Sequence, residues 1–185
     1  MRKLDYILQA WRYHKVEPHI PAHCKILDIG AFDGSFLRRL EDRIAEGVAI
    51  DPLLEETKTD KITFRRIKAS GKLPFPDASF DVVTMLAVYE HLGAEREAVT
   101  AEVFRILSNK GLALLTVPSN KVDYILAVLL KLRLIDGQSL EEHDHFDGAK
   151  TRDVFEHQGF TLRHWSRFQL GLNNFFIFEK EGRNV

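Results

Sequence analysis

Short apolar runs alternate with helix-like segments through most of the chain. Five runs predict strands at residues 25–29, 48–51, 62–67, 80–85 and 112–117, and two segments between them predict helices at 35–40 and 94–107. Strands separated by helices form βαβ units. The pattern therefore predicts an α/β fold with a parallel sheet and right-handed crossovers.

Both ends of the chain add elements to this pattern. Leu4, Ile7, Leu8 and Trp11 fall on one face of a predicted N-terminal helix at 1–17, before two prolines break the chain. Near the C-terminus we expect a helix at 149–158 and a strand pair at 161–168 and 173–179. With no repeat or linker in between, residues 1–185 are expected to form a single domain.

Residues 122–135 predict a helix that is apolar on several sides, within an insertion at about 119–148. Such a helix is buried or covers an apolar surface. We expect it to border an apolar acceptor pocket or to form a homodimer contact.

Composition and charge indicate which binding partners and which cellular compartment to expect. A formal net charge of −1 gives no reason to expect nucleic-acid binding. The single cysteine, Cys24, excludes an intrachain disulfide, fits a reducing compartment and is expected to be a small buried residue. The longest apolar stretch, 124–130, is far shorter than the ~20 residues of a membrane span. A cytoplasmic, soluble protein is expected.

Two predicted strands end in an acid. Asp28 lies in the first strand and is followed by Gly30 and Gly34, and the second strand ends at Asp51. Such a turn presents backbone N–H groups and a helix N-terminus to a ligand, and an acid after the second strand can bind ribose hydroxyls. A helix-capping role is the alternative for Asp51.

The order of these motifs resembles the class I S-adenosylmethionine-dependent methyltransferases, nearest the small-molecule branch that includes the ubiquinone-type O-methyltransferases. Leu27-Asp28-Ile29-Gly30 is similar to the family's first motif, and residues 73–83 are similar to the segment before its fourth strand. Glu90-His91 and residues 103–118 continue the resemblance, which runs from about residue 25 to 180.

This resemblance implies a Rossmann-like open sheet, mostly parallel with an antiparallel C-terminal strand, and helices on both faces. It also implies S-adenosylmethionine as cofactor, with Asp28 near its ammonium group and Asp51 on its ribose. The implied cofactor-binding residues are Asp28, Gly30, Ala31, Gly34, Asp51, Pro52, Leu53, Ala69, Ser70, Met85 and Leu86.

The sequence departs from the family at three positions near this site. Phe32 replaces the central glycine of the turn, and phenylalanine fits there only if its backbone avoids the conformations that favour glycine. Ala69 replaces an acid that contacts adenine. Ala87 replaces the first glutamate of a Glu-x-x-Glu-His run that supports a divalent metal in ubiquinone-type relatives, so no metal is expected.

His91 is the leading candidate for a catalytic base, because histidine titrates near neutral pH and can accept a proton from a hydroxyl group. The alternative is that His91 packs at a helix start and bonds the backbone. His143 and His145, beside Asp144, offer metal ligands in principle, but a solvated loop or a pocket rim fits adjacent loop residues better. Tyr13 and Trp11 either cover the cofactor pocket or anchor the first helix.

Three functions are compatible with these features. The first is transfer of a methyl group to a small-molecule acceptor, with apolar compounds among the candidates. The second is a dinucleotide or nucleotide-sugar enzyme, disfavoured because Phe32 occupies the second glycine of Gly-x-Gly-x-x-Gly and the chain is short. The third is a non-catalytic protein of the same fold, with a binding or regulatory role.

Overall fold

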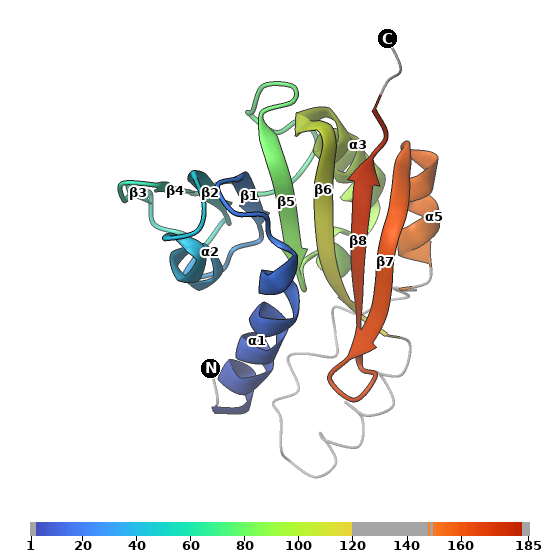
Figure 1. The fold of residues 1–185 in the computed structure, drawn as a ribbon, viewed down its shortest axis with the longest axis horizontal. Helices are drawn as coiled ribbons and strands as arrows, with labels where there is room; N and C mark the ends of the chain where they lie inside the picture. The colour runs from blue at the N-terminus through green and yellow to red at the C-terminus, as the bar shows by residue number, and fades with distance from the viewer. Residues whose placement is uncertain (1–2, 120–147, 149, 183–185) are drawn as a thin grey trace.

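The computed structural model describes all residues except 1–2, 120–147, 149 and 183–185, and its described strands form one sheet (Figure 1). The strand order is β3-β4-β2-β1-β5-β6-β8-β7. The strands are β1 Lys25–Ile29, β2 Glu46–Ile50, β3 Thr57–Lys58, β4 Ile62–Arg65, β5 Phe80–Leu86, β6 Leu107–Pro118, β7 Phe160–Phe168 and β8 Asn173–Lys180.

Strands β4, β2, β1, β5 and β6 run parallel to one another. Strand β8 is antiparallel to both β6 and β7, and the short β3 is antiparallel to β4. The predicted Rossmann-like sheet, mostly parallel with an antiparallel C-terminal strand, is confirmed.

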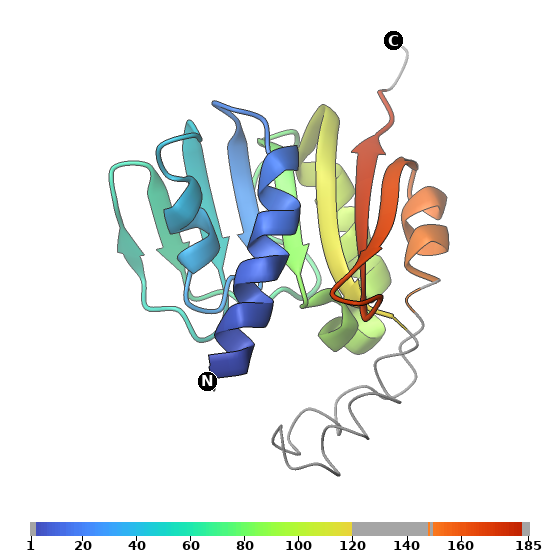
Figure 2. The ribbon, with the colours of Figure 1, turned by 60° about the horizontal axis from the view of Figure 1, so that its bottom comes forward.

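Helices cover both faces of the sheet. The helical elements are α1 Lys3–Val16, η1 Glu17–His19, α2 Ser35–Leu40, η2 Tyr89–Glu95, α3 Arg96–Ile106 and α5 Lys150–His157. Figure 2 shows α1 and α2 on one face and α3 and α5 on the other.

Alternating residues of the strands fill two cores, one on each face of the sheet. In β1, Ile26 packs with Phe36 and Leu37 of α2, whereas its neighbour Leu27 packs with Val99 and Val103 of α3. Because β1 is buried on both faces, its apolar residues are nearly continuous.

The described elements differ from the sequence-based expectation mainly at their ends. The helix expected from residue 94 begins at Arg96 and follows η2, in which Gly93 has a non-helical backbone with a φ of 53°. Strand β6 begins at Leu107 and contains an irregularity, since Phe80 pairs with Leu107 but Val82 pairs with Leu112. The expected helix at 122–135, and His143 and His145, lie outside the described residues. Within the described ranges, every helix is too short or too polar to reach across a bilayer.

Candidate functional site

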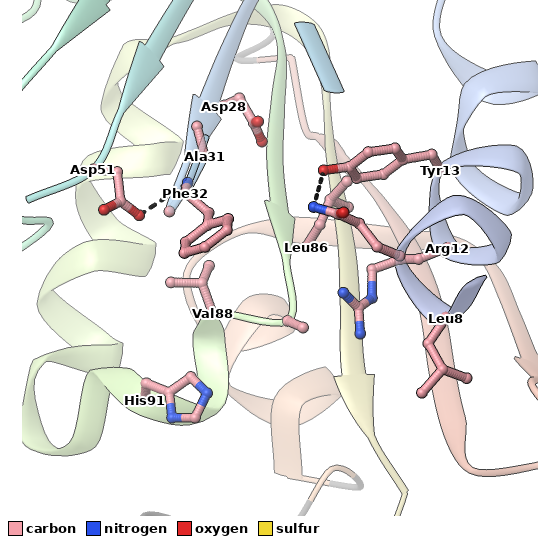
Figure 3. Close-up of a pocket in the computed structure, with 13 residues that line it drawn as sticks. Leu8, Arg12, Tyr13, Asp28, Ala31, Phe32, Asp51, Leu86, Val88 and His91 are labelled. Carbon is pink, nitrogen blue, oxygen red and sulfur yellow. Dashed lines mark hydrogen bonds between the residues drawn. The ribbon is translucent and has the colours of Figure 1, made fainter. Parts of the chain in front are cut away.

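A pocket of about 640 Å³ lies where the carboxyl ends of β1, β2 and β5 meet helix α1 (Figure 3). Ligands of open α/β sheets bind at this edge. The residues that line it are Leu8, Gln9, Arg12, Tyr13, Asp28, Gly30, Ala31, Phe32, Asp51, Leu86, Ala87, Val88 and His91.

The turn after β1 is tied to the end of β2 by backbone hydrogen bonds. The N–H groups of Gly30 and Ala31 both donate to the carbonyl of Ile50, at 2.9 and 3.1 Å. Gly30 has a φ of 73°, and a Cβ atom there would overlap the side chain of Val88. Glycine is therefore required by both the backbone conformation and the packing.

The backbone of Phe32 does not avoid the conformations that favour glycine, contrary to the condition set for it above. Its φ is 53°, in the left-handed region that favours glycine, and its ring is 46% exposed beside the pocket. The N–H group of Phe32 donates to Oδ2 of Asp51 at 3.0 Å. This hydrogen bond and those of the neighbouring turn hold a conformation that the residue alone would disfavour.

Asp51 links two loops at the edge of the pocket. Its Oδ2 accepts from Phe32, and its Oδ1 accepts from the N–H group of Leu53 at 2.8 Å. Each carboxylate oxygen retains capacity for a further hydrogen bond. The side chain is thus fixed in place and can still accept hydrogen bonds from a ligand's hydroxyl groups.

Asp28 forms the deepest acidic group of the pocket and is only 2% exposed. Burial raises its pKa to about 7, although a hydrogen bond from Thr84 Oγ1 to Asp28 Oδ1 (2.6 Å) opposes the increase. Asp51 and Asp33 raise this pKa further, and no cation in the described part of the chain lowers it. A ligand with a positively charged group would compensate these carboxylates, and S-adenosylmethionine carries an ammonium group and a sulfonium.

Helix α1 supplies one wall of the pocket. Tyr13 is linked by its hydroxyl to Ser35 Oγ at 2.9 Å and accepts from Gln9 Nε2 at 2.7 Å. Tyr13 therefore lines the pocket and also joins α1 to the start of α2, whereas Trp11 is not part of the lining. Sequence analysis missed Gln9 and Arg12. Their spacing from Leu8 and Tyr13 places all four on one helical face, which is the signal that could have identified them.

His91 lies at the exposed rim of the pocket, and its backbone N–H group donates to the carbonyl of Val88 at 3.0 Å. Glu90 is 5% exposed and does not line the pocket. Burial raises the pKa of Glu90 to about 7, and the charges of Arg12 and Arg96 oppose the increase. Among the residues that the structure describes, no three potential ligands gather as a metal site.

The structure brings six of the proposed site residues together in the pocket lining: Asp28, Gly30, Ala31, Asp51, Leu86 and His91. Gly34 is outside the lining, and a Cβ atom there would overlap Phe64. Met85 is fully buried in the core on the α3 side, because alternation along β5 turns it away from the face of Leu86. The remaining four, Pro52, Leu53, Ala69 and Ser70, do not line this pocket.

The segment at 73–83 has a clear structural role. Arg105 of α3 donates to the carbonyls of Leu73 and Phe75, at 3.1 and 2.9 Å, and to the carboxylates of Asp77 and Glu102. This arginine fixes the segment against α3 before the chain enters β5. The segment thereby positions β5, whose carboxyl end contributes Leu86 to the pocket.

Residues 27–115 match a family model described as a methyltransferase domain. A comparison with curated proteins finds no significant match. The chain is similar in structure to an S-adenosylmethionine-dependent methyltransferase from Mesorhizobium loti, with a TM-score of 0.73, 15% identity, and coverage of 91% of this chain and 97% of the other.

Two further solved structures share this fold. One is a chain from the complex between the Haloferax volcanii Trm112 methyltransferase activator and a protein described as a methyltransferase (TM-score 0.73, 16% identity, 94% and 91% of the two chains covered). The other is the [4+2]-cyclase SpnF (TM-score 0.71, 12% identity, 91% and 79% covered). At these identities the similarities establish the shared fold.

The methyltransferase-domain match covers the first motif, the two acidic strand ends and β5, which together form most of the pocket's sheet edge. The buried carboxylates there fit a cofactor that carries positive charge. The methyltransferase-domain match over residues 27–115 and the shared fold therefore support an S-adenosylmethionine-dependent methyltransferase, with S-adenosylmethionine as its cofactor.

Proposed function

We propose that the methyl acceptor is a small molecule that binds in the same pocket as the cofactor. The supporting observation is that the lining of one cavity of about 640 Å³ combines carboxyl groups and a glycine turn with an arginine, a histidine and apolar side chains. We assign Asp28, Gly30, Ala31 and Asp51 to the cofactor, and call them the cofactor half. We assign Leu8, Arg12, Ala87, Val88 and His91 to the acceptor, and call them the acceptor half.

The cofactor half supplies the contacts that orient S-adenosylmethionine. Asp28 would hold its ammonium group and Asp51 its ribose hydroxyls, while Gly30 and Ala31 allow the backbone to approach the methionyl part. Of the other expected contacts, Pro52 and Leu53 would lie beside adenine. The cofactor supplies an electrophilic methyl group on a positively charged sulfur.

His91 is proposed as the base that accepts a proton from a hydroxyl acceptor. Its position at the pocket rim gives it access to both solvent and ligand. The protein otherwise contributes by aligning the two reactants, which can lower a barrier by ~7–11 kcal/mol. A base is needed only when the acceptor must lose a proton during the reaction.

This proposal is tested with labelled S-adenosylmethionine and a panel of phenols, catechols, amines and carboxylic acids. For a hydroxyl acceptor, we expect His91→Ala to reduce turnover by ~10²–10⁴-fold and to leave S-adenosylhomocysteine affinity within about threefold. His157→Ala, which alters an exposed histidine of α5, is the matched control. Unchanged turnover in His91→Ala would remove histidine from the mechanism.

A non-catalytic or non-methylating role is the second candidate, and Phe32 is the observation that favours it. Its ring stands beside the cofactor half, where the family has glycine. The fold is also shared by a [4+2]-cyclase, so the architecture admits other activities. Tight binding of S-adenosylhomocysteine without methyl transfer to any compound of the panel would support this candidate.

We further propose that residues 1–185 act as one domain in the cytoplasm. Cys24 is buried and free, as suits a reducing compartment.

Homodimerisation through residues 122–135 remains a proposal, because that segment lies outside the described residues. Sedimentation at several protein concentrations would measure it.

A further inference from the structure

Among the described residues that line the pocket, Arg12 alone carries a permanent positive charge. In Figure 3 its guanidinium group extends from α1 into the pocket on the side opposite to Asp51. The side chain is half-buried, and its Nε atom has no hydrogen-bond partner among the described residues. A charged donor that is shielded from water and unpaired is costly, so this atom is suited to a ligand acceptor.

Glu90 is a buried acidic residue that compensates part of this charge. It interacts electrostatically with Arg12, but its own Oε2 atom is also buried and without a hydrogen-bond partner in the described part of the chain. Arg12 Nε and Glu90 Oε2 therefore do not form a hydrogen bond with each other. The described residues therefore use only part of the donor capacity of Arg12.

The residues assigned to the cofactor half and those assigned to the acceptor half differ in charge. The cofactor half contains the carboxyl groups of Asp28 and Asp51, which disfavour a second negative charge. The acceptor half combines Arg12 with apolar side chains such as Leu8 and Val88. An anionic group would be repelled from the first half and attracted to the second.

We propose that Arg12 binds an anionic group, a carboxylate or a phosphate, on the methyl acceptor. The guanidinium group can donate two parallel hydrogen bonds to such a group, and the apolar neighbours would contact the rest of the acceptor. This inference rests on the proposed function, since it assigns the acceptor half to a substrate. Arg12 is then a specificity-determining residue, and Glu90 is the charge with which the acceptor competes.

Benzoate and benzamide form a matched pair of probes, because they differ in charge but hardly in shape. In protein saturated with S-adenosylhomocysteine, we expect benzoate to bind with a dissociation constant of about 1 mM, measured by calorimetry. Benzamide should bind at least tenfold more weakly. Arg12→Met should weaken benzoate at least tenfold and change S-adenosylhomocysteine affinity less than threefold. Arg152→Met, which alters an exposed arginine of α5, should change neither.

Glu90→Gln gives a second test, in which benzoate affinity should increase rather than decrease. Removing the charge that competes for Arg12 should tighten benzoate binding severalfold, whereas a purely structural role for Glu90 predicts weaker binding. Because this variant keeps Arg12, it also tests the inference if Arg12→Met fails to fold.

Three results would overturn the inference: no benzoate binding up to ~20 mM, equal binding of benzamide, or a more than tenfold loss of S-adenosylhomocysteine affinity in Arg12→Met. The third result would assign Arg12 to the cofactor's own carboxylate. Repeating the benzoate titration without S-adenosylhomocysteine separates the two proposals. If the wild-type protein does not bind that ligand, the proposed function fails, and the titration of the free protein still tests Arg12.

Discussion

The carboxyl group of Asp28 couples the charge of the pocket to pH. Burial raises its pKa to about 7, whereas in the unfolded chain an aspartate has a pKa of ~3.9. Between these values the folded protein binds more protons than the unfolded chain. The contribution of Asp28 to stability therefore decreases as pH rises from ~4 to ~7 and is constant above that range. A bound cation would favour the ionised form.

This linkage predicts that S-adenosylhomocysteine, which retains the ammonium group, binds more weakly in acid. If Asp28 is ionised in the complex, the dissociation constant measured by calorimetry should be about tenfold higher at pH 6 than at pH 8. Asp28→Asn should weaken binding and largely remove the pH dependence. Asp81→Asn alters an exposed aspartate at the opposite end of β5 and should retain it. A flat wild-type profile would show that Asp28 does not meet the ammonium group.

Individual pocket residues could be predicted where a short sequence pattern indicates them. Asp28, Gly30 and Asp51 follow from apolar runs that end in an acid or a glycine turn. Arg12 belongs to no such run: its spacing places it on one helical face with Leu8 and Tyr13, but that this face lines the pocket depends on where α1 docks. The left-handed backbone of Phe32 could not be predicted from its sequence neighbours either, since its N–H group donates the supporting hydrogen bond to Asp51, 19 residues away.

At the scale of elements, the turn between β1 and α2 is built around close packing against β4. Gly34 precedes the first residue of α2 with a φ of 71°, and a Cβ atom there would overlap the ring of Phe64 in β4. The glycine was expected to admit the cofactor. Its described surroundings also give it a packing role.

We expect Gly34→Ala to lower the free energy of unfolding by ~2–5 kcal/mol, because it adds a steric conflict to an unfavourable backbone conformation. Gly71→Ala is the matched control, since Gly71 also has a positive φ of 53° but no atom within 4 Å of its Cβ position. It should cost only about 1–2 kcal/mol. Urea denaturation measures both, and equal losses would contradict the packing role.

Strands buried on both faces were predicted well, because their continuous apolar residues leave little ambiguity. The two-residue strand β3 was missed: Thr57 and Lys58 are exposed and polar, and only pairing with β4 defines them as a strand. The start of α3 was placed too early because η2 merges with it in the sequence pattern. Such boundaries depend on backbone conformation at Gly93 rather than on periodicity.

For the whole molecule, the pocket depends on contacts between distant parts of the chain. Gln169, between β7 and β8, donates from Nε2 to the carbonyl of Leu8 at 2.7 Å. Tyr13 connects the same helix to Ser35 of α2. These contacts place α1 over the carboxyl edge of the sheet. The sequence identified that edge as the ligand site, but the wall that closes it follows only from the folded structure.

The most direct test of this account is thermal unfolding with S-adenosylhomocysteine, with NAD as the control ligand. At ~100 times its dissociation constant, S-adenosylhomocysteine should stabilise the protein by about 2.7 kcal/mol, which corresponds to an increase in Tm of roughly 5–10 °C. NAD should produce no shift. An unchanged Tm at millimolar S-adenosylhomocysteine, or an equal shift with NAD, would contradict the assignment of this pocket to S-adenosylmethionine.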